Sequence, residues 1–260
     1  MGLLVPEDPP PFKITNLNGR APVLLICDHA SNVIPSKLNN LGLDSDTLQK
    51  HIAWDIGAAQ ITLGLSNALD AMAILAGFSR LVIDANRKPY DLGSIPEESD
   101  GIIIPGNKEL SKKIIMLRIN ECFWPYHKNI FNGFSNLRNR GRTPTLFSIH
   151  TFTPSMNGKN RPWDIGVLWN RDPRIAKQLI LELQNHPDKL NVGDNLPYSG
   201  NQFAYSLDTH AATIGLPNCA VEIRQDLANT EQKVSYWVNL LSGTLNKILE
   251  KPEIKHAQFY

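Results

Sequence analysis

Short apolar runs alternate with longer amphipathic segments along the whole chain. Seven short runs have the length and residue types of strands, at 21–27, 71–77, 79–87, 143–150, 163–169, 190–192 and 218–224. The run "APVLLIC" at 21–27 is apolar throughout, as is typical of a strand covered on both faces of a parallel sheet. Helical spacing predicts helices over 44–69, 108–140, 172–185 and 228–249. Strands that alternate with helices predict an α/β sandwich.

The expected helices carry recognisable start and break signals. The segment 44–69 offers helix starts at Ser45 or Asp46 and again at Asp55. Asp172 is expected as an N-cap with Pro173 at the first helical position. A proline at position 125 should kink or divide the helix over 108–140.

A chain of 260 residues is long enough to bury one substantial core, and we expect a single domain over 1–260. The first 20 residues, rich in proline and acid near their start, are expected to form an extended arm over this body. The segment 90–106 has no clear period and predicts a long loop, which is usually functional or mobile and could close as a lid.

The charge balance is nearly neutral, with 26 basic and 25 acidic residues. It predicts neither a nucleic-acid partner nor an anionic membrane surface. The sequence contains no apolar run of membrane-spanning length and no signal-peptide pattern at its start, so we expect a soluble, cytoplasmic protein. Cys27, Cys122 and Cys219 are widely spaced in apolar surroundings and are expected to be core residues.

Polar residues with catalytic potential follow or end four of the predicted strands. Ligands in open α/β sheets bind beyond the carboxyl ends of the strands, so these exits are the informative positions. They carry Asp28 and His29, Asn86 and Arg87, His150, and Glu222.

Each of these residues also has a structural interpretation. His29 could be a turn residue, and Asp55 could be only a helix N-cap. His150 could be a core histidine at the margin of the sheet whose hydrogen bonds are all made within the protein. Glu222 lies between two apolar residues and needs a charged partner, for which Arg224 is the nearest candidate.

Two imidazoles and one carboxylate form the ligand set of a catalytic zinc that keeps a position open for water. Zinc lowers the pKa of that water to about 7. A further carboxylate can move the proton, and a guanidinium can hold a substrate carboxylate through two hydrogen bonds. His29, Asp55, His150, Glu222 and Arg87 would fill these roles, although no HExxH-type motif selects them.

A serine hydrolase that uses Ser31 or Ser148 with a nearby histidine is an alternative from another class. The sequence has no G-x-S-x-G motif, which disfavours this alternative.

Eight motifs together resemble the N-formylglutamate amidohydrolase family. In chain order they are "DHASNVIP", "HIAWDIGA", "FSRLVIDANR", "PYH", "SIHTFTP", "WDIGVLWNRDPR", "PYSG" and "AVEIRQDL". The resemblance runs from about residue 20 to about residue 248. The resemblance implies a fold akin to zinc-dependent exopeptidases and phosphorylase/hydrolase-like proteins. That fold is a three-layer α/β/α sandwich with a mostly parallel mixed central sheet.

The resemblance also implies roles for individual residues. It implies Zn²⁺, or another divalent metal, held by His29, His150 and Asp55, with Asp28 as an alternative acidic ligand or as an acid that orients His29 or a neighbouring loop. Glu222 resembles the glutamate that serves as general base. Asn86 and Arg87 resemble a pair that binds a carboxylate, with Arg80 as a second cation. His127 either supports the residues of the site or packs between helices.

The implied activity is hydrolysis of the amide of an N-formyl or other N-acyl amino acid, such as N-formylglutamate, by zinc-activated water. Two alternatives stay open: an amidase that acts on a different N-acyl amino acid or small peptide, and a non-catalytic protein that binds a small acid. The expected partner is a carboxylate-bearing small molecule. The sequence does not decide between a monomer and a homodimer.

Overall fold

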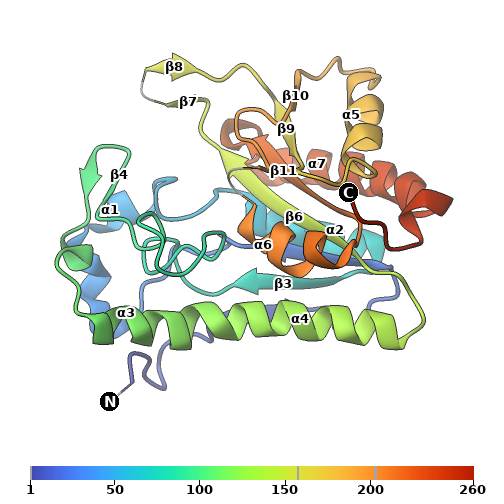
Figure 1. The fold of residues 1–260 in the computed structure, drawn as a ribbon. Coiled ribbons are helices and arrows are strands. Elements are labelled where there is room, and N and C mark those ends of the chain that lie inside the picture. The colour runs from blue at the N-terminus through green and yellow to red at the C-terminus, as the bar shows by residue number, and fades with distance from the viewer. Residues whose placement is uncertain (1, 157, 202–203) are drawn as a thin grey trace.

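The computed structural model describes residues 2–156, 158–201 and 204–260. Its centre is a seven-stranded sheet in the order β1-β3-β2-β6-β11-β9-β10 (Figure 1). The strands are β1 (Phe12–Thr15), β2 (Val23–Cys27), β3 (Met72–Ala76), β6 (Thr145–Phe152), β9 (Ile165–Leu168), β10 (Val192–Asp194) and β11 (Asn218–Arg224). β1 runs antiparallel to β3 and β9 runs antiparallel to β11, whereas the other neighbours are parallel. This confirms the predicted mostly parallel mixed sheet.

Helices cover both faces of this sheet and form the outer layers of the sandwich. The helices are α1 (Ser45–Leu48), α2 (Ala58–Leu69), α3 (Lys112–Arg118), α4 (Trp124–Asn139), α5 (Ala176–Gln184), α6 (Tyr205–His210) and α7 (Glu231–Leu249). Residues of α2, α5 and α7 form one core with one face of the sheet, and residues of α4 and α6 form another with the opposite face. Strand β2 contributes alternate residues to the two cores and is fully buried, as its unbroken apolar sequence predicts.

The predicted strand at 79–87 does not form. Its apolar residues Leu81 to Ile83 are buried in a third core beside the sheet. Side chains from later in the chain satisfy its backbone: Asn107 donates to the carbonyl of Leu81 (2.9 Å), and Arg118 donates to the carbonyl of Val82 (3.1 Å). These partners replace a neighbouring strand, and the segment turns instead of extending.

The predicted helix over 108–140 is divided close to Pro125. After α3, the π-helical segment η3 (Ile119–Phe123) leads into α4, where Pro125 is the second residue. Proline cannot donate a backbone hydrogen bond, so the helical pattern changes near it. Together the three segments form the long rod that crosses Figure 1.

Two other sequence predictions are revised by local contacts. Residues 12–15 of the expected arm form the edge strand β1. The regular helix expected from Asp172 begins at Ala176, whereas Asp172 accepts hydrogen bonds from the backbone N–H and the guanidinium of Arg174 in the turn before it.

Two hairpins project from the end of the sheet where the candidate residues gather. They are formed by β4 (Glu98–Ser99) with β5 (Ile102–Ile103), inside the expected long loop, and by β7 (Ser155–Met156) with β8 (Lys159–Asn160). Short 3₁₀ turns complete the description: η1 (Ser36–Gly42), η2 (Pro105–Asn107), η4 (Ala212–Ile214), η5 (Gln225–Leu227) and η6 (Pro252–Ile254).

The three cysteines are buried and unbonded to one another, as expected of core residues. Among the residues that the structure describes, no helix has the length and apolar character needed to cross a membrane.

Candidate active site

Three of the predicted residues converge at the carboxyl ends of the parallel strands. His29 follows β2, His150 lies on β6, and Asp55 precedes α2. One ligand atom from each lies within 4.8 Å of the others. Asp55 Oδ2 is 2.9 Å from His150 Nδ1 and 3.3 Å from His29 Nδ1. All three side chains are buried, so the cluster gathers charge in a place that water barely reaches.

A tight backbone approach fixes the position of Asp55. The N-cap of α2 is Gly57, whose φ of +86° favours glycine, and a Cβ there would lie 2.2 Å from the carbonyl oxygen of Ala228. Asp55 is therefore not the cap that the sequence also allowed. Its backbone N–H donates to the carbonyl of His29 (2.9 Å), and its side chain is left to face the two histidines.

A second carboxylate holds the outer nitrogen of each histidine. His29 Nε2 lies 2.7 Å from Asp84 Oδ1, and His150 Nε2 lies 3.1 Å from Asp28 Oδ2. Ionised carboxylates only accept, so each Nε2 donates to its carboxylate. His150 Nδ1 faces the Asp55 carboxylate in the same way, so we assign a second proton to it; although burial opposes the charge, the hydrogen bonds to Asp28 and Asp55 raise the pKa of His150 well above its usual value. A metal that displaces this proton would find both Nδ1 lone pairs directed into the cluster. Metal-binding histidines in proteins are commonly oriented by a carboxylate in this way.

Asp28 is saturated by donors that lie away from the cluster. Tyr126 and Ser206 donate to its Oδ1 at 2.9 and 2.7 Å, and Ser148 donates to its Oδ2 at 3.2 Å. Although burial opposes ionisation, the hydrogen bond and charge of His150 hold the pKa of Asp28 well below its usual range. Asp28 therefore orients His150, whereas Asp55 supplies the oxygen inside the cluster.

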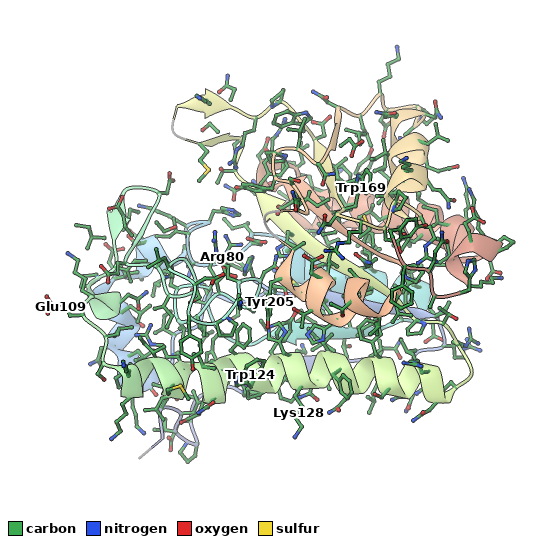
Figure 2. The ribbon with its side chains drawn as sticks, in the orientation of Figure 1. Arg80, Glu109, Trp124, Lys128, Trp169 and Tyr205 are labelled. Atoms are coloured by element: carbon green, nitrogen blue, oxygen red, sulfur yellow. The ribbon has the colours of Figure 1, made fainter. Side chains whose placement is uncertain are left out.

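Arg80 is the positive charge nearest to these residues. Its Nη2 donates to Asp55 Oδ1 (2.7 Å) and also touches His29 Nδ1. Burial opposes ionisation of Asp55, but the Arg80 charge and the histidines hold its pKa well below the usual value. Figure 2 shows Arg80 in the middle of the molecule, among crowded loop side chains. A metal held by the same atoms of His29 and Asp55 requires the guanidinium to withdraw from them.

Glu222 lies on β11 directly beside His150 of β6 in the parallel register. Its Oε2 is buried and has no hydrogen-bond partner in the described structure. Burial raises the pKa of Glu222 to about 7; the charge of His150 opposes this rise and that of Asp55 adds to it. Arg224 does not pair with it, because Arg224 Nε donates to Asp226 (2.8 Å). A carboxyl group with a pKa near neutrality suits proton transfer.

Asn86 and Arg87 lie on the loop that follows the turned segment at 79–83. Arg87 Nε is 3.4 Å from Asp84 Oδ2, and its side chain stays 42% exposed. A Cβ at Gly93 would lie 2.7 Å from Arg87 Nη1, so the glycine makes room for this guanidinium. Asn86 Oδ1 accepts from the backbone of Ser206 (3.0 Å) and ties the loop to α6.

His127 packs against α6, away from the carboxylate and histidine cluster. Its Nε2 lies 2.9 Å from the carbonyl of Ala85, so this nitrogen carries the proton, and its Nδ1 accepts from His210 Nε2 at 2.8 Å. Phe123 and Tyr205 pack against its ring. His127 therefore supports the loop before Asn86 through a backbone contact.

The cluster opens into a cavity of about 250 Å³. His29, His150, Glu222 and the predicted Arg80, Asn86 and Arg87 line it, together with Asp84, His51 and Tyr198. Sequence reasoning missed these last three. Asp84 was visible as an acid at the end of "RLVID", His51 lies four residues before Asp55, and Tyr198 lies in the motif "PYSG", to which no role was assigned.

The two serines of the alternative hydrolase have other roles. Ser31 Oγ accepts from the backbone of Val33 (3.1 Å) within a turn, and Ser148 contacts Asp28 and the outer nitrogen of His150. In the described part of the chain no histidine is placed as a general base for Ser31, and the His150 nitrogen nearest to Ser148 is held by Asp28.

The cluster suits a divalent metal by its donor chemistry. Two imidazole nitrogens and one carboxylate oxygen are a common zinc ligand set that leaves a position open. Both histidines present Nδ1 inward and are anchored on the other side by carboxylates. The residues present therefore fit a metal at His29, Asp55 and His150.

Two of the solved structures that match this chain cover nearly all of it. Gene product Atu2144 from Agrobacterium tumefaciens is 32% identical with a TM-score of 0.93, over 96% of this chain and 99% of that one. The N-formylglutamate amidohydrolase from Ralstonia eutropha JMP134 is 17% identical with a TM-score of 0.68, over 92% and 97%. It supports the hydrolase-like fold. A search of curated proteins finds no match.

The profile of one protein family covers most of the chain. It is described as N-formylglutamate amidohydrolase and matches residues 21–228, a range that includes every residue of the cluster and of its cavity. All eight motifs that suggested the resemblance fall within this range. The chain belongs to the N-formylglutamate amidohydrolase family and is an amidohydrolase.

Proposed function

We propose that this chain is a metal-dependent hydrolase that cleaves the amide of an N-formyl or other N-acyl amino acid, such as N-formylglutamate. One observation carries the proposal: ligand atoms of His29, Asp55 and His150 lie within 4.8 Å of one another and open into the cavity that Glu222 lines. Family membership supports the amide chemistry.

The metal, Zn²⁺ or another divalent ion, would be held by His29 Nδ1, His150 Nδ1 and the Asp55 carboxylate. When bound, it supplies a Lewis acid that polarises the amide carbonyl and lowers the pKa of water to about 7. Asp84 and Asp28 keep the two imidazoles in the tautomer that presents Nδ1.

Glu222 is the proposed general base and acid. Its raised pKa leaves it able both to take a proton from the attacking water and to give it to the leaving nitrogen. The water oxygen forms a bond to the acyl carbon, the C–N bond breaks, and the proton that Glu222 carries leaves with the amine. The products are formate, or another acid, and a free amino acid.

Arg87 is the proposed anchor for the carboxylate of the substrate. Its half-exposed guanidinium at the cavity wall can present two parallel N–H donors to a carboxylate. Asn86 holds the backbone of this loop to α6, and Arg80 supplies a second positive charge beside the reacting amide. N-formylglutamate carries two carboxylates, which suits a site with two cations.

A non-catalytic homologue that binds a small acid would need the arginines but not the cluster. The buried and unpartnered Oε2 of Glu222 argues against it, because burying such a group is costly unless it has a use.

The direct test is hydrolysis of N-formylglutamate and N-acetylglutamate by the purified protein, with and without a chelator. We expect activity that depends on the metal and that falls strongly in Glu222→Gln. Full activity in the metal-stripped protein would overturn the proposal.

A further inference from the structure

A second chamber of about 440 Å³ adjoins the cavity of the cluster. The two share one band of wall residues: His51, Arg80, Ser99, Met156 and Tyr198. Beyond this band the second chamber, called the outer chamber below, continues under the β4–β5 hairpin and the end of α1. The metal-ligand candidates and Glu222 do not line it.

The sizes of the two spaces differ in a way that bears on the substrate. The cavity at the cluster is smaller than the roughly 300 to 1,000 Å³ that pockets for drug-sized ligands occupy, whereas the outer chamber alone falls within that range. The inner cavity suits the amino acid and its scissile amide. The outer chamber offers room for a further group about as large as this amino acid.

The wall of the outer chamber combines apolar and polar side chains, and the polar ones include Gln49, Thr153 and Gln225. Ile52, Ile56 and Ile102 provide apolar surface, and the exposed Lys50 and Asp100 at its margin have opposite charges. Gln225 Oε1 is buried and has no hydrogen-bond partner in the described structure. A buried acceptor without a partner costs free energy unless a ligand donates to it. This wall suits an uncharged chain that carries an N–H group.

The position of Arg87 indicates which part of the substrate reaches the outer chamber. Arg87 lines only the inner cavity. If the substrate carboxylate binds Arg87 and the amide lies at the cluster, the acyl group points toward the shared band. It then extends past that band into the outer chamber. The amino acid is held on the other side of the scissile bond.

We propose that the preferred substrates are amino acids acylated by a chain that is longer than acetyl and carries its own amide, as in an N-acylated dipeptide, with this chain held in the outer chamber. Gln225 Oε1 accepts from the amide N–H of the chain, and the isoleucines contact its apolar part. This inference rests on the proposed function and specifies its substrate class.

The test compares four substrates that release the same amino acid. They are the formyl, acetyl, hexanoyl and acetylglycyl derivatives of glutamate, each measured as kcat/KM with zinc-loaded protein. Hexanoyl fills the chamber without an amide, and acetylglycyl adds the amide. We expect the acetylglycyl compound to exceed the acetyl compound by about tenfold or more, with hexanoyl between them, as one added hydrogen bond and buried methylenes predict.

Two variants assign the effect to the chamber. Ile102→Trp, on the half-buried β5 strand, should lower kcat/KM for the two long acyl groups by about tenfold and leave formyl and acetyl nearly unchanged. Gln225→Leu should lower the acetylglycyl value by about fivefold to tenfold and spare hexanoyl. Gln60→Leu, an exposed position on α2 that does not line either space, is the matched control.

The outcomes separate this inference from the function on which it rests. Absence of hydrolysis for all four compounds would reject the proposed function. Hydrolysis of the formyl and acetyl compounds with no gain for longer chains would reject only the outer-chamber assignment. A loss already on formylglutamate in Ile102→Trp would also overturn it, because the chamber would then hold the amino-acid side chain. The substrate series on the unaltered protein decides the matter even where a variant folds poorly.

Discussion

Glu222 and His150 lie directly opposite each other on the neighbouring parallel strands β11 and β6. The register brings a carboxyl group with a pKa of about 7 next to a histidine of the candidate metal cluster. Two residues that lie 72 positions apart in sequence are thereby fixed by backbone pairing and not by loops. Strands position catalytic groups more precisely than loops do.

Glu222→Gln is expected to lower kcat by about 10²- to 10⁴-fold, the usual contribution of a general base. The amide keeps the shape of the side chain but cannot take the proton. Metal content should be unchanged, because Glu222 is not among the candidate ligands. Steady-state kinetics and metal analysis check this, with the exposed Glu98→Gln as a matched control. A variant that keeps wild-type kcat would contradict the role.

Asp84→Asn is expected to weaken metal binding by about 10- to 100-fold, the usual effect of replacing the partner of a ligating histidine. The neutral amide holds His29 Nε2 less strongly and does not fix its tautomer as firmly. Calorimetric titration with zinc measures the change. The exposed Asp91→Asn in the same loop should bind zinc like the wild type, and equal affinity in both variants would count against the assignment.

Arg87→Lys is expected to raise KM for formylglutamate by about tenfold while kcat changes little. Lysine keeps the charge but loses the two parallel donors that match a carboxylate. The exposed Arg171→Lys, which lies outside the cavity wall, is the control. A fall in kcat at unchanged KM would show that Arg87 does not serve as a substrate anchor.

His127→Gln is expected to flatten the acid dependence of stability. Burial and the neighbouring His210 lower the pKa of His127 to about 4, below the roughly 6.5 of an unfolded chain. Between these values the unfolded state binds more protons, so the folded protein loses stability as the pH falls from 6.5 toward 4. We expect the wild type to lose about 2 kcal/mol more than the variant over this range.

Urea unfolding at pH 7, 6, 5 and 4 measures this loss for both proteins. The glutamine can still donate to the carbonyl of Ala85, so the contact is preserved at neutral pH. His256→Gln, at an exposed position, controls for loss of a histidine as such. Parallel curves for the wild type and His127→Gln would refute the prediction.

The apolar runs of the sequence were sufficient to predict the central strands, because strands buried on both faces are apolar on both faces. The strand predicted at the run "RLVID" does not form, and the reason is physical. Its carbonyls are satisfied by Asn107 and Arg118, which lie in segments that no local pattern connects to it. Tertiary contacts therefore determined the conformation of a segment whose local sequence is typical of a strand.

The candidate site was accessible from sequence only in part. His29, His150 and Glu222 stand at or beyond strand ends, where the topology of the sheet brings them together. Asp28 was expected to orient His29 or a neighbouring loop, but it contacts His150, because the direction of its side chain depends on Tyr126 and Ser206. The outer chamber is formed partly by a hairpin, and the hydrophobic pattern of the sequence does not predict where that hairpin lies.

Metal content coupled to activity tests the central claim most directly. The purified protein should bind one divalent ion per chain, lose hydrolysis of formylglutamate when the ion is chelated, and regain it when zinc is returned. The His150→Ala variant should not retain the ion, and it should not regain hydrolysis when zinc is added. Undiminished hydrolysis by metal-free protein would contradict the account.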